Sequence, residues 1–303
     1  MSTKVQFGYY PQQCNIKIGD ITLENHTNIE ERIACVKALE TIHGDWLYAP
    51  QQQQKDILSG AINSLPYASR VFGLPKTHIF VHRKADSLEH VDFLIWCISF
   101  FIGMRLTATE AGFLDATPIK PGKLTDFILN SSLAEAISLS ESFWNNFSQD
   151  DRKPKLITGI IHSLFLAQNP LYLPFERFNY LYIALDGCFA LTQSTLRPNR
   201  HLSHAARIEW MCQQFDMPIP NWARPDNKNK TEISIVRNET IHEALFFERP
   251  LGFSIFIKRN SGNVLLEMEA LICRLIVSLL GKPDCEYVKS SVNTRQRHGL
   301  DLS

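Results

Sequence analysis

Residues 175–191, Phe-Glu-Arg-Phe-Asn-Tyr-Leu-Tyr-Ile-Ala-Leu-Asp-Gly-Cys-Phe-Ala-Leu, carry the pattern that decides the fold of the second part of the chain. Large apolar or aromatic side chains recur at helical spacing, at Phe178, Tyr182, Leu185 and Phe189. An α-helix places residues with this spacing on one face. The stretch therefore predicts a helix with one buried stripe.

The sequence on both sides of this stretch predicts further helices. Apolar residues recur at helical spacing in the runs Leu133–Phe147, Leu156–Leu166, Ser203–Phe215, Thr231–Phe247 and Val264–Leu280. Several runs are followed by helix-ending residues, as at Pro170, Pro218 and Gly281. Helices joined by short connections pack into a bundle. We therefore expect residues 125–303 to form an all-helical domain.

The first part of the chain has a different pattern. Short alternating or β-leaning runs predict strands at Val5–Tyr10, Cys14–Leu23 and His78–His82. The apolar run Val91–Met104, with Ser87 as a candidate N-cap, predicts a helix. The segment Ile29–His43 fits either a helix or a strand.

The boundary between the two parts is expected near Phe113–Leu124, because this segment holds two prolines and a glycine and predicts a loop or linker. The predicted fold class is α+β. A mixed α/β N-terminal domain at residues 1–124 is followed by an all-α bundle at residues 125–303.

Composition and charge limit the class of protein. The chain of 303 residues is 45% apolar and 20% charged, which is typical of globular domains. It has 31 basic and 31 acidic residues, so any surface that attracts nucleic acid must be local. The 7 cysteines form no Cys-x-x-Cys pair and indicate reduced thiols rather than a disulfide framework.

The remaining signals point to a cytoplasmic protein without membrane contact. The N-terminus lacks the apolar core of a signal peptide. The run Phe93–Met104 is shorter than the ~20 residues of a membrane crossing. His201 and His204 have no carboxylate or cysteine at ligand spacing, so we interpret both as solvated. Glycine-rich phosphate loops are absent, and we expect neither a cofactor nor a bound metal.

The candidate chemistry lies in residues 235–243, Ile-Val-Arg-Asn-Glu-Thr-Ile-His-Glu. Arg237 is followed directly by the polar Asn238 and, after four intervening residues, by His242. Histidine is the side chain suited to moving protons near neutral pH. Arginine presents a planar set of donors that matches a phosphate. These residue types suit proton transfer beside a bound phosphate group.

A helical projection of this run separates two faces. At about 100° per residue, one face gathers the residues expected to pack on the core, Ile233, Val236, Thr240 and Ala244. Asn238 and His242 lie on the opposite face. Arg237 is roughly 140° round the helix from His242, so the two are not expected to share a face within one chain.

The outward face carries apolar residues as well. Ile235 and Leu245 flank Asn238 and His242 in the projection. A polar pair among apolar neighbours on an outward face predicts that a second helix covers it. A symmetric homodimer through this helix is the simplest source of that second helix.

The Arg-Asn-x-x-x-His pattern resembles the RNase signature of HEPN (higher eukaryotes and prokaryotes nucleotide-binding) proteins. The arrangement is similar as well: an amphipathic helix bearing Tyr180–Asp186, then the Arg-Asn helix, then a long apolar closing helix. The resemblance covers about the last half of the chain. It looks closest to the ApeA-like stand-alone HEPN RNases.

This resemblance implies an endoribonuclease whose two motifs meet across a homodimer. His242 would be the general acid or base, Arg237 would stabilise the phosphoryl charge, and Asn238 would orient the imidazole or the phosphate. Asp186 is an auxiliary candidate that would orient His242 or Arg237, although a plain helix-surface carboxylate is the competing interpretation. The resemblance further implies antiphage defence or a toxin-like stress response, with a phage-derived or nucleotide trigger sensed by the N-terminal domain.

Other hypotheses remain open at the level of sequence. The bundle could be a non-catalytic HEPN-fold module that binds nucleotide or RNA or mediates dimerisation, and the N-terminal domain could make the protein an adaptor. Arg237 could be a structural ion-pair partner of Glu239, of Glu243 or of another helix, and His242 could be a surface or interface histidine.

Overall fold

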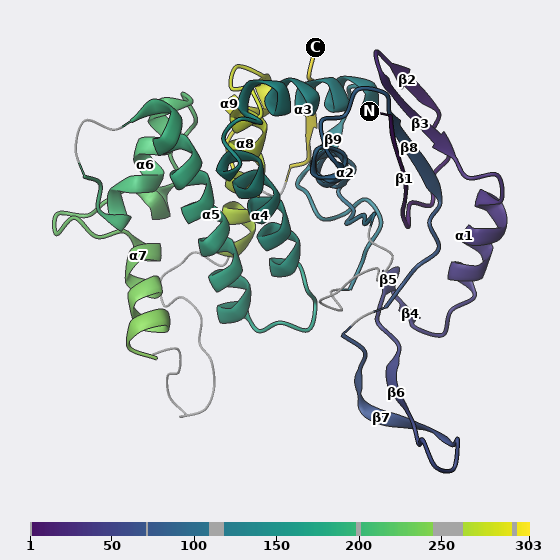
Figure 1. Cartoon of the computed structure of the whole chain (residues 1–303). Helices are drawn as coiled ribbons and strands as arrows, with labels where there is room; N and C mark the ends of the chain where they lie inside the picture. Colours follow the sequence, from purple (N-terminus) through teal and green to yellow (C-terminus); the bar gives the residue numbers. More distant parts are fainter. Residues whose placement is uncertain (1, 71, 109–117, 198–200, 245–262, 293–295) are drawn as a thin grey trace. The chain divides into compact units, whose positions relative to one another are not determined.

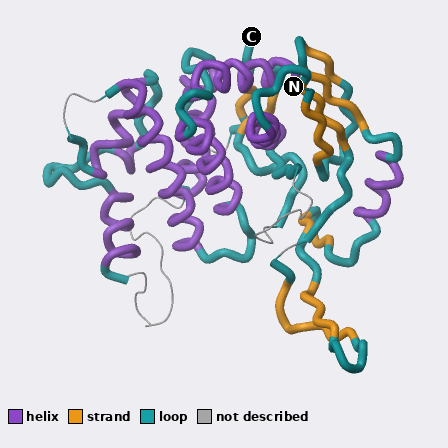
Figure 2. Tube along the Cα trace, in the orientation of Figure 1, coloured by secondary structure: helices purple, strands orange, loops and turns teal. Residues whose placement is uncertain are grey.

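The computed structural model describes residues 2–70, 72–108, 118–197, 201–244, 263–292 and 296–303. It contains both helices and strands, so the fold class is α+β. The chain divides into two compact units. The first comprises Met1–Leu124 with Ala136–Ser138, and the second comprises Thr125–Glu135 with Leu139–Ser303. Most strands lie in the first unit and most helices in the second (Figure 1, Figure 2).

The first unit is built on a four-stranded antiparallel sheet. Its strands are ordered β1 (Thr3–Phe7), β8 (His78–His82), β3 (Ile21–Asn25) and β2 (Ile16–Ile18). The predicted strand His78–His82 is confirmed as β8. Its residues alternate between buried and half-buried positions, and Phe80 is paired with Val5 on one side and Leu23 on the other. Phe80 and Leu23 are buried and form part of the core of the unit, and Val5 is half-buried.

The predicted helix of the first unit is confirmed as α2 (Leu88–Ile102). The Ser87 side chain accepts a hydrogen bond from the His90 backbone N–H at 3.2 Å, which satisfies one free donor at the helix start. The helix ends at Gly103, whose φ of 64° lies in the left-handed region that glycine tolerates best. The ambiguous segment Ile29–His43 holds both kinds of element, because Ile29–Lys37 form the helix α1 and Ile42–His43 form the strand β4.

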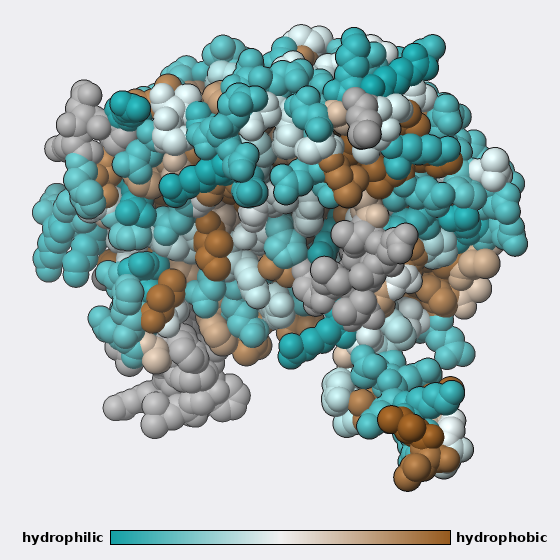
Figure 3. All heavy atoms as spheres, in the orientation of Figure 1, coloured by the Kyte–Doolittle hydropathy of each residue, from teal (hydrophilic) through white to brown (hydrophobic). Residues whose placement is uncertain are grey.

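Several short strands complete the first unit and were not predicted. They are β4 (Ile42–His43), β5 (Trp46–Leu47), β6 (Gln51–Lys55) and β7 (Ile62–Ala68). The β6–β7 hairpin has an apolar tip, where Ile57 and Leu58 are 96% and 99% exposed (Figure 3). Ile119 pairs with Leu47 in an isolated β-bridge, within the segment predicted as a loop. Residues 113–117 of that segment lie outside the described residues.

The second unit consists mainly of helices. They are α3 (Leu133–Phe147), α4 (Arg152–Ala167), α5 (Pro174–Leu196), α6 (His204–Gln214), the 3-10 helix η1 (Asn221–Ala223), α7 (Glu232–Arg237), the π-helix η2 (Asn238–His242), α8 (Val264–Leu279) and α9 (Glu286–Lys289). A two-stranded parallel sheet, β9 (Phe127–Leu129) with β10 (His298–Leu300), was not predicted.

Helix α5 lies against both α4 and α8 within this unit. The predicted buried stripe of α5 is confirmed, because Phe178, Tyr182, Leu185 and Phe189 are all at most 7% exposed. Packing of amphipathic faces, rather than helix propensity alone, stabilises an arrangement of this kind.

The state of the thiols agrees with the expectation of reduced cysteines. All 7 cysteines are free, and Cys97, Cys188, Cys212 and Cys273 are buried. Burial raises the pKa of the Cys212 thiol to about 12, so this group is uncharged at neutral pH. Within the described residues, no helix has both the length and the apolarity that a bilayer crossing requires.

The contact between α4 and α5 leads to a stability prediction at Gly187. A Cβ at this position would lie 2.7 Å from Cγ1 of the buried Ile160. Gly187→Ala is therefore expected to destabilise the protein by about 1–3 kcal/mol through overpacking, despite a helix-propensity gain of about 1 kcal/mol. Gly159→Ala in α4 is the matched control, since nothing lies within 4 Å of its added Cβ. Chemical denaturation of both variants should give changes of opposite sign, and equal changes would contradict the close packing at Gly187.

Candidate functional site

The motif segment begins as an α-helix and continues as a π-helical turn. The Thr231 side chain caps α7 by accepting from the Ser234 backbone N–H at 3.2 Å. After Arg237 the chain enters η2 at Asn238–His242. A single α-helix over Thr231–Phe247 was predicted. This prediction is wrong for the described residues, because only Glu232–Arg237 are α-helical and the chain is π-helical at Asn238–His242. Residues 245–247 lie outside the described residues.

The π-helical turn changes which residues share a face. Its hydrogen bonds run from i to i+5, so residues five apart lie roughly above one another. Arg237 and His242 are five apart, and Nη1 of Arg237 hydrogen-bonds Nε2 of His242. The expectation that these two residues occupy different faces of the helix is therefore wrong, because it assumed α-helical rotation throughout. Nη1 of Arg237 also donates to Oδ1 of Asn238 at 3.0 Å.

The direction of the contact with His242 follows from the chemistry of the groups. A guanidinium has only donors, so Nε2 of His242 is the acceptor. Arg237 forms no ion pair with Glu239 or Glu243 within the described part of the chain, and the structural ion-pair interpretation is not supported. Asn238 and His242 are exposed, as the projection predicted.

The face of this segment that was expected to pack on the core agrees with the helical projection only in its first turns. Ile233 is 1% exposed, and Val236 and Thr240 are half-buried. Ala244 is exposed, contrary to the projection, and its φ of 54° is left-handed. The wider turn of η2 and this backbone reversal move Ala244 off the core face.

A second set of side chains reaches the motif from α5 and α6. The Tyr182 ring lies under the guanidinium of Arg237, with Cζ 5.9 Å from the ring centroid. The Tyr182 hydroxyl and Nδ1 of His204 are 2.9 Å apart, which is hydrogen-bonding distance. Nδ1 of His204 is also 3.9 Å from Oδ1 of Asp186. Arg207 donates to the same oxygen at 2.8 Å.

Three helical segments thus meet at one place, since α5 contacts α6 and α6 contacts α7 (Figure 1). We refer to the side chains that meet there as the His–Arg cluster. The cluster consists of Tyr182, Asp186, His204, Arg207, Arg237, Asn238 and His242.

Electrostatics couple the members of the cluster. Burial, followed by the nearby Asp186 charge, raises the pKa of Tyr182 to about 12. Burial also lowers the pKa of His204, and the charges of Arg207, Arg237 and His242 act in the same direction. Asp186 opposes this change. His204 is therefore biased towards its neutral form, which can accept a proton at neutral pH.

The structure bears on two interpretations made from the sequence, those of His204 and Asp186. His201 is exposed, but His204 is half-buried and bonded to Tyr182, so the interpretation of His204 as solvated is wrong. Asp186 was expected to orient His242 or Arg237, or to be a plain surface carboxylate. Its side chain is 39% exposed, which agrees with a surface carboxylate, and it pairs with Arg207 beside His204.

The sequence contained a partial signal for Tyr182, His204 and Arg207, which were not predicted as site residues. Tyr182 and Asp186 are four apart on one predicted helix, and His204 and Arg207 are three apart on the next. Each pair therefore shares a helix face. Nothing in the local spacing indicates that the two faces meet.

The two arginines of the cluster have donor capacity to spare. Nε of Arg207 and Nε of Arg237 are buried and have no hydrogen-bond partner within the described residues. Most buried polar groups are paired, and unpaired ones are unusual. With two guanidinium groups and one carboxylate, that of Asp186, the cluster carries a net positive charge that favours an anion nearby.

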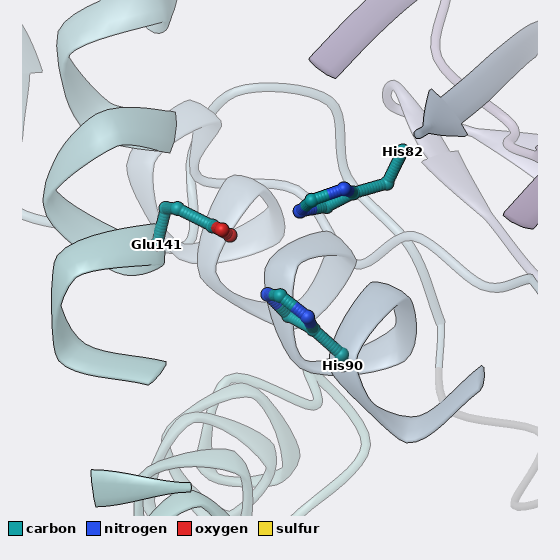
Figure 4. A group of neighbouring side chains, drawn as sticks. All are labelled: His82, His90 and Glu141. Atoms are coloured by element: carbon teal, nitrogen blue, oxygen red, sulfur yellow. The ribbon is translucent and has the colours of Figure 1, made fainter. Parts of the chain in front are cut away.

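A second histidine pair lies in the first unit. His82 of β8 and His90 of α2 point towards one another, with ring centroids 4.7 Å apart (Figure 4). Glu141, which Figure 4 also labels, belongs to the second unit. Two imidazoles are fewer ligands than a protein zinc site uses.

Comparison of the chain with protein-family models, with curated proteins and with solved structures finds no match.

Proposed function

We propose that residues 125–303 form a HEPN-type helical domain and that the chain is a metal-independent endoribonuclease. The observation that carries the proposal is the contact between Arg237 and His242 across the π-helical turn η2. The contact places a guanidinium that can bind phosphate next to an imidazole that can transfer protons, at the exposed end of the segment. π-helical turns occur frequently at functional sites.

The proposed reaction is attack of a ribose 2′-hydroxyl on its own 3′-phosphate. The bond between the 2′-oxygen and phosphorus forms, and the bond to the leaving 5′-oxygen breaks. One group must take the proton of the 2′-hydroxyl, and another must supply a proton to the 5′-oxygen. His242 performs one of these transfers, and the donors of Arg237 hold the phosphoryl oxygens as charge grows on them. The products carry a 2′,3′-cyclic phosphate and a 5′-hydroxyl.

Asn238 is the orienting residue in this proposal. Its Oδ1 accepts from Nη1 of Arg237 at 3.0 Å, which fixes the guanidinium beside the exposed imidazole of His242. RNA is the proposed substrate because the reaction requires a 2′-hydroxyl. The proposed biological setting is antiphage defence or a toxin-like stress response, with the first unit as the sensor of a phage-derived or nucleotide signal.

A homodimer through the motif segment is part of the proposal. Ile241 is 49% exposed beside the exposed His242. Ile183 on α5 is 56% exposed. Exposed apolar side chains next to functional polar groups favour contact with another protein surface. In a symmetric pair the same surfaces would meet, and each chain would bring its own cluster to the interface.

The direct test is incubation of the purified chain with total RNA in buffer containing EDTA. Cleavage is expected to continue without divalent metal and to leave 2′,3′-cyclic phosphate ends, which resist ligation until they are opened. Fragments with 3′-hydroxyl ends, or cleavage that EDTA abolishes, would contradict the proposal. Tight RNA binding without cleavage would instead support a non-catalytic binding module.

A further inference from the structure

The environment of His204 resembles that of an imidazole held for proton transfer. Nδ1 lies 2.9 Å from the Tyr182 hydroxyl and 3.9 Å from Oδ1 of Asp186. Asp186 is in turn fixed by Arg207 at 2.8 Å. Partners on Nδ1 orient the ring and leave Nε2 as the reacting nitrogen. The side chain is 35% exposed, and no hydrogen bond occupies Nε2 within the described residues.

His204 is also linked to the motif. The Tyr182 residue that contacts His204 places its ring beneath Arg237, and Arg237 contacts His242. One aromatic side chain therefore connects the two histidines through the arginine.

We propose that His204 is the second proton-transfer residue of the ribonuclease site. The inference rests on the proposed function. One of the two histidines, His204 or His242, accepts the proton of the 2′-hydroxyl as the new bond to phosphorus forms. The other donates a proton to the 5′-oxygen as its bond to phosphorus breaks. Each chain then carries an acid and a base, with Arg237 between them and Tyr182 as a positioning residue.

Substrates with a bridging sulfur at the 5′-position separate the two roles. A thiolate leaves without being protonated, so such a substrate does not need the general acid. His204→Ala and His242→Ala are each expected to slow cleavage of an ordinary RNA oligonucleotide by about 10²–10⁴-fold. On the sulfur-bridged oligonucleotide, only the variant that lacks the acid should recover its rate. His201→Ala, at the exposed histidine nearby, should cleave both substrates like the wild type.

The pH dependence adds a readout that a purely structural role would not change. The wild-type rate should follow a bell-shaped profile, and each histidine variant should lose one limb of it. Tyr182→Phe removes only the hydroxyl that holds Nδ1 of His204 and retains the ring under Arg237. This milder variant is expected to fold, to lower the rate by about tenfold, and to shift the limb that His204→Ala removes.

The outcomes distinguish this inference from the proposed function. Wild-type cleavage by His204→Ala, together with loss of cleavage in His242→Ala, would overturn the role of His204 and leave the ribonuclease in place. Slow cleavage by both variants without rescue of either would also overturn it. A wild-type protein that leaves both substrates intact would overturn the proposed function itself.

Discussion

His242→Ala is expected to reduce RNA cleavage by about 10²–10⁴-fold, because it removes one of the groups that moves protons in the reaction. It also removes the acceptor of the Arg237 contact and leaves that guanidinium without its partner across η2. Expression of the wild-type chain should slow cell growth if the ribonuclease acts on cellular RNA. Growth should be normal with the variant.

The exposed position of His242 allows an effect on catalysis to be separated from an effect on folding stability. His242 is exposed, so its truncation opens no core cavity and should change the free energy of unfolding by less than about 0.5 kcal/mol. The assay compares growth and total-RNA cleavage for the wild type, His242→Ala and the control His201→Ala. Equal cleavage by the wild type and His242→Ala would place the chemistry elsewhere.

Arg274→Ala is expected to destabilise the second unit by about 3–5 kcal/mol, which is a large part of the 5–15 kcal/mol typical of a folded domain. Arg274 is 1% exposed, and its Nη1 donates to Oδ2 of Asp126 at 2.7 Å. Nη2 donates to Oγ of Ser290 at 3.0 Å, and Nε donates to the Ser290 carbonyl at 3.2 Å. Tyr287 hydrogen-bonds the other oxygen of Asp126. Removing the guanidinium would leave a mostly buried carboxylate without its counter-ion.

Denaturation of the full chain in urea measures this effect. Arg224→Ala is the matched control, because Arg224 is exposed and its truncation should change stability by less than about 0.5 kcal/mol. Arg274→Met combined with Asp126→Leu should be less damaging than Arg274→Ala alone, since it leaves no unpaired charge. A double variant as unstable as the single one would show that packing around Arg274, and not its charge, dominates.

Helices of the second unit could be predicted from the sequence because their signal is local. The run Leu133–Phe147 coincides with α3, and the stripe from Phe178 to Phe189 is buried in α5. Spacing of apolar residues every three or four positions reflects the geometry of a single helix and needs no knowledge of distant contacts. Helix ends were less accurate, as the longer extents of α4 and α5 demonstrate.

The small strands were missed for the opposite reason. Strand β6 reads Gln-Gln-Gln-Gln-Lys and has few of the β-branched or aromatic residues that indicate a strand. Strands β9 and β10 pair with each other although they lie near opposite ends of the second unit in the sequence. Pairing between strands that are distant in sequence leaves little trace in local composition.

For the candidate site, the sequence by itself determined the residue types and their spacing. It placed Arg237, Asn238 and His242 in one helical segment, with Asn238 and His242 facing outward. Only the tertiary structure decided which groups meet. The π-helical turn brings Arg237 onto the face of His242, and the packing of α5, α6 and α7 adds His204 and Tyr182. A periodicity argument assumes one constant rotation per residue and treats each helix alone. It therefore cannot register a local change of helix type or the convergence of side chains from separate helices.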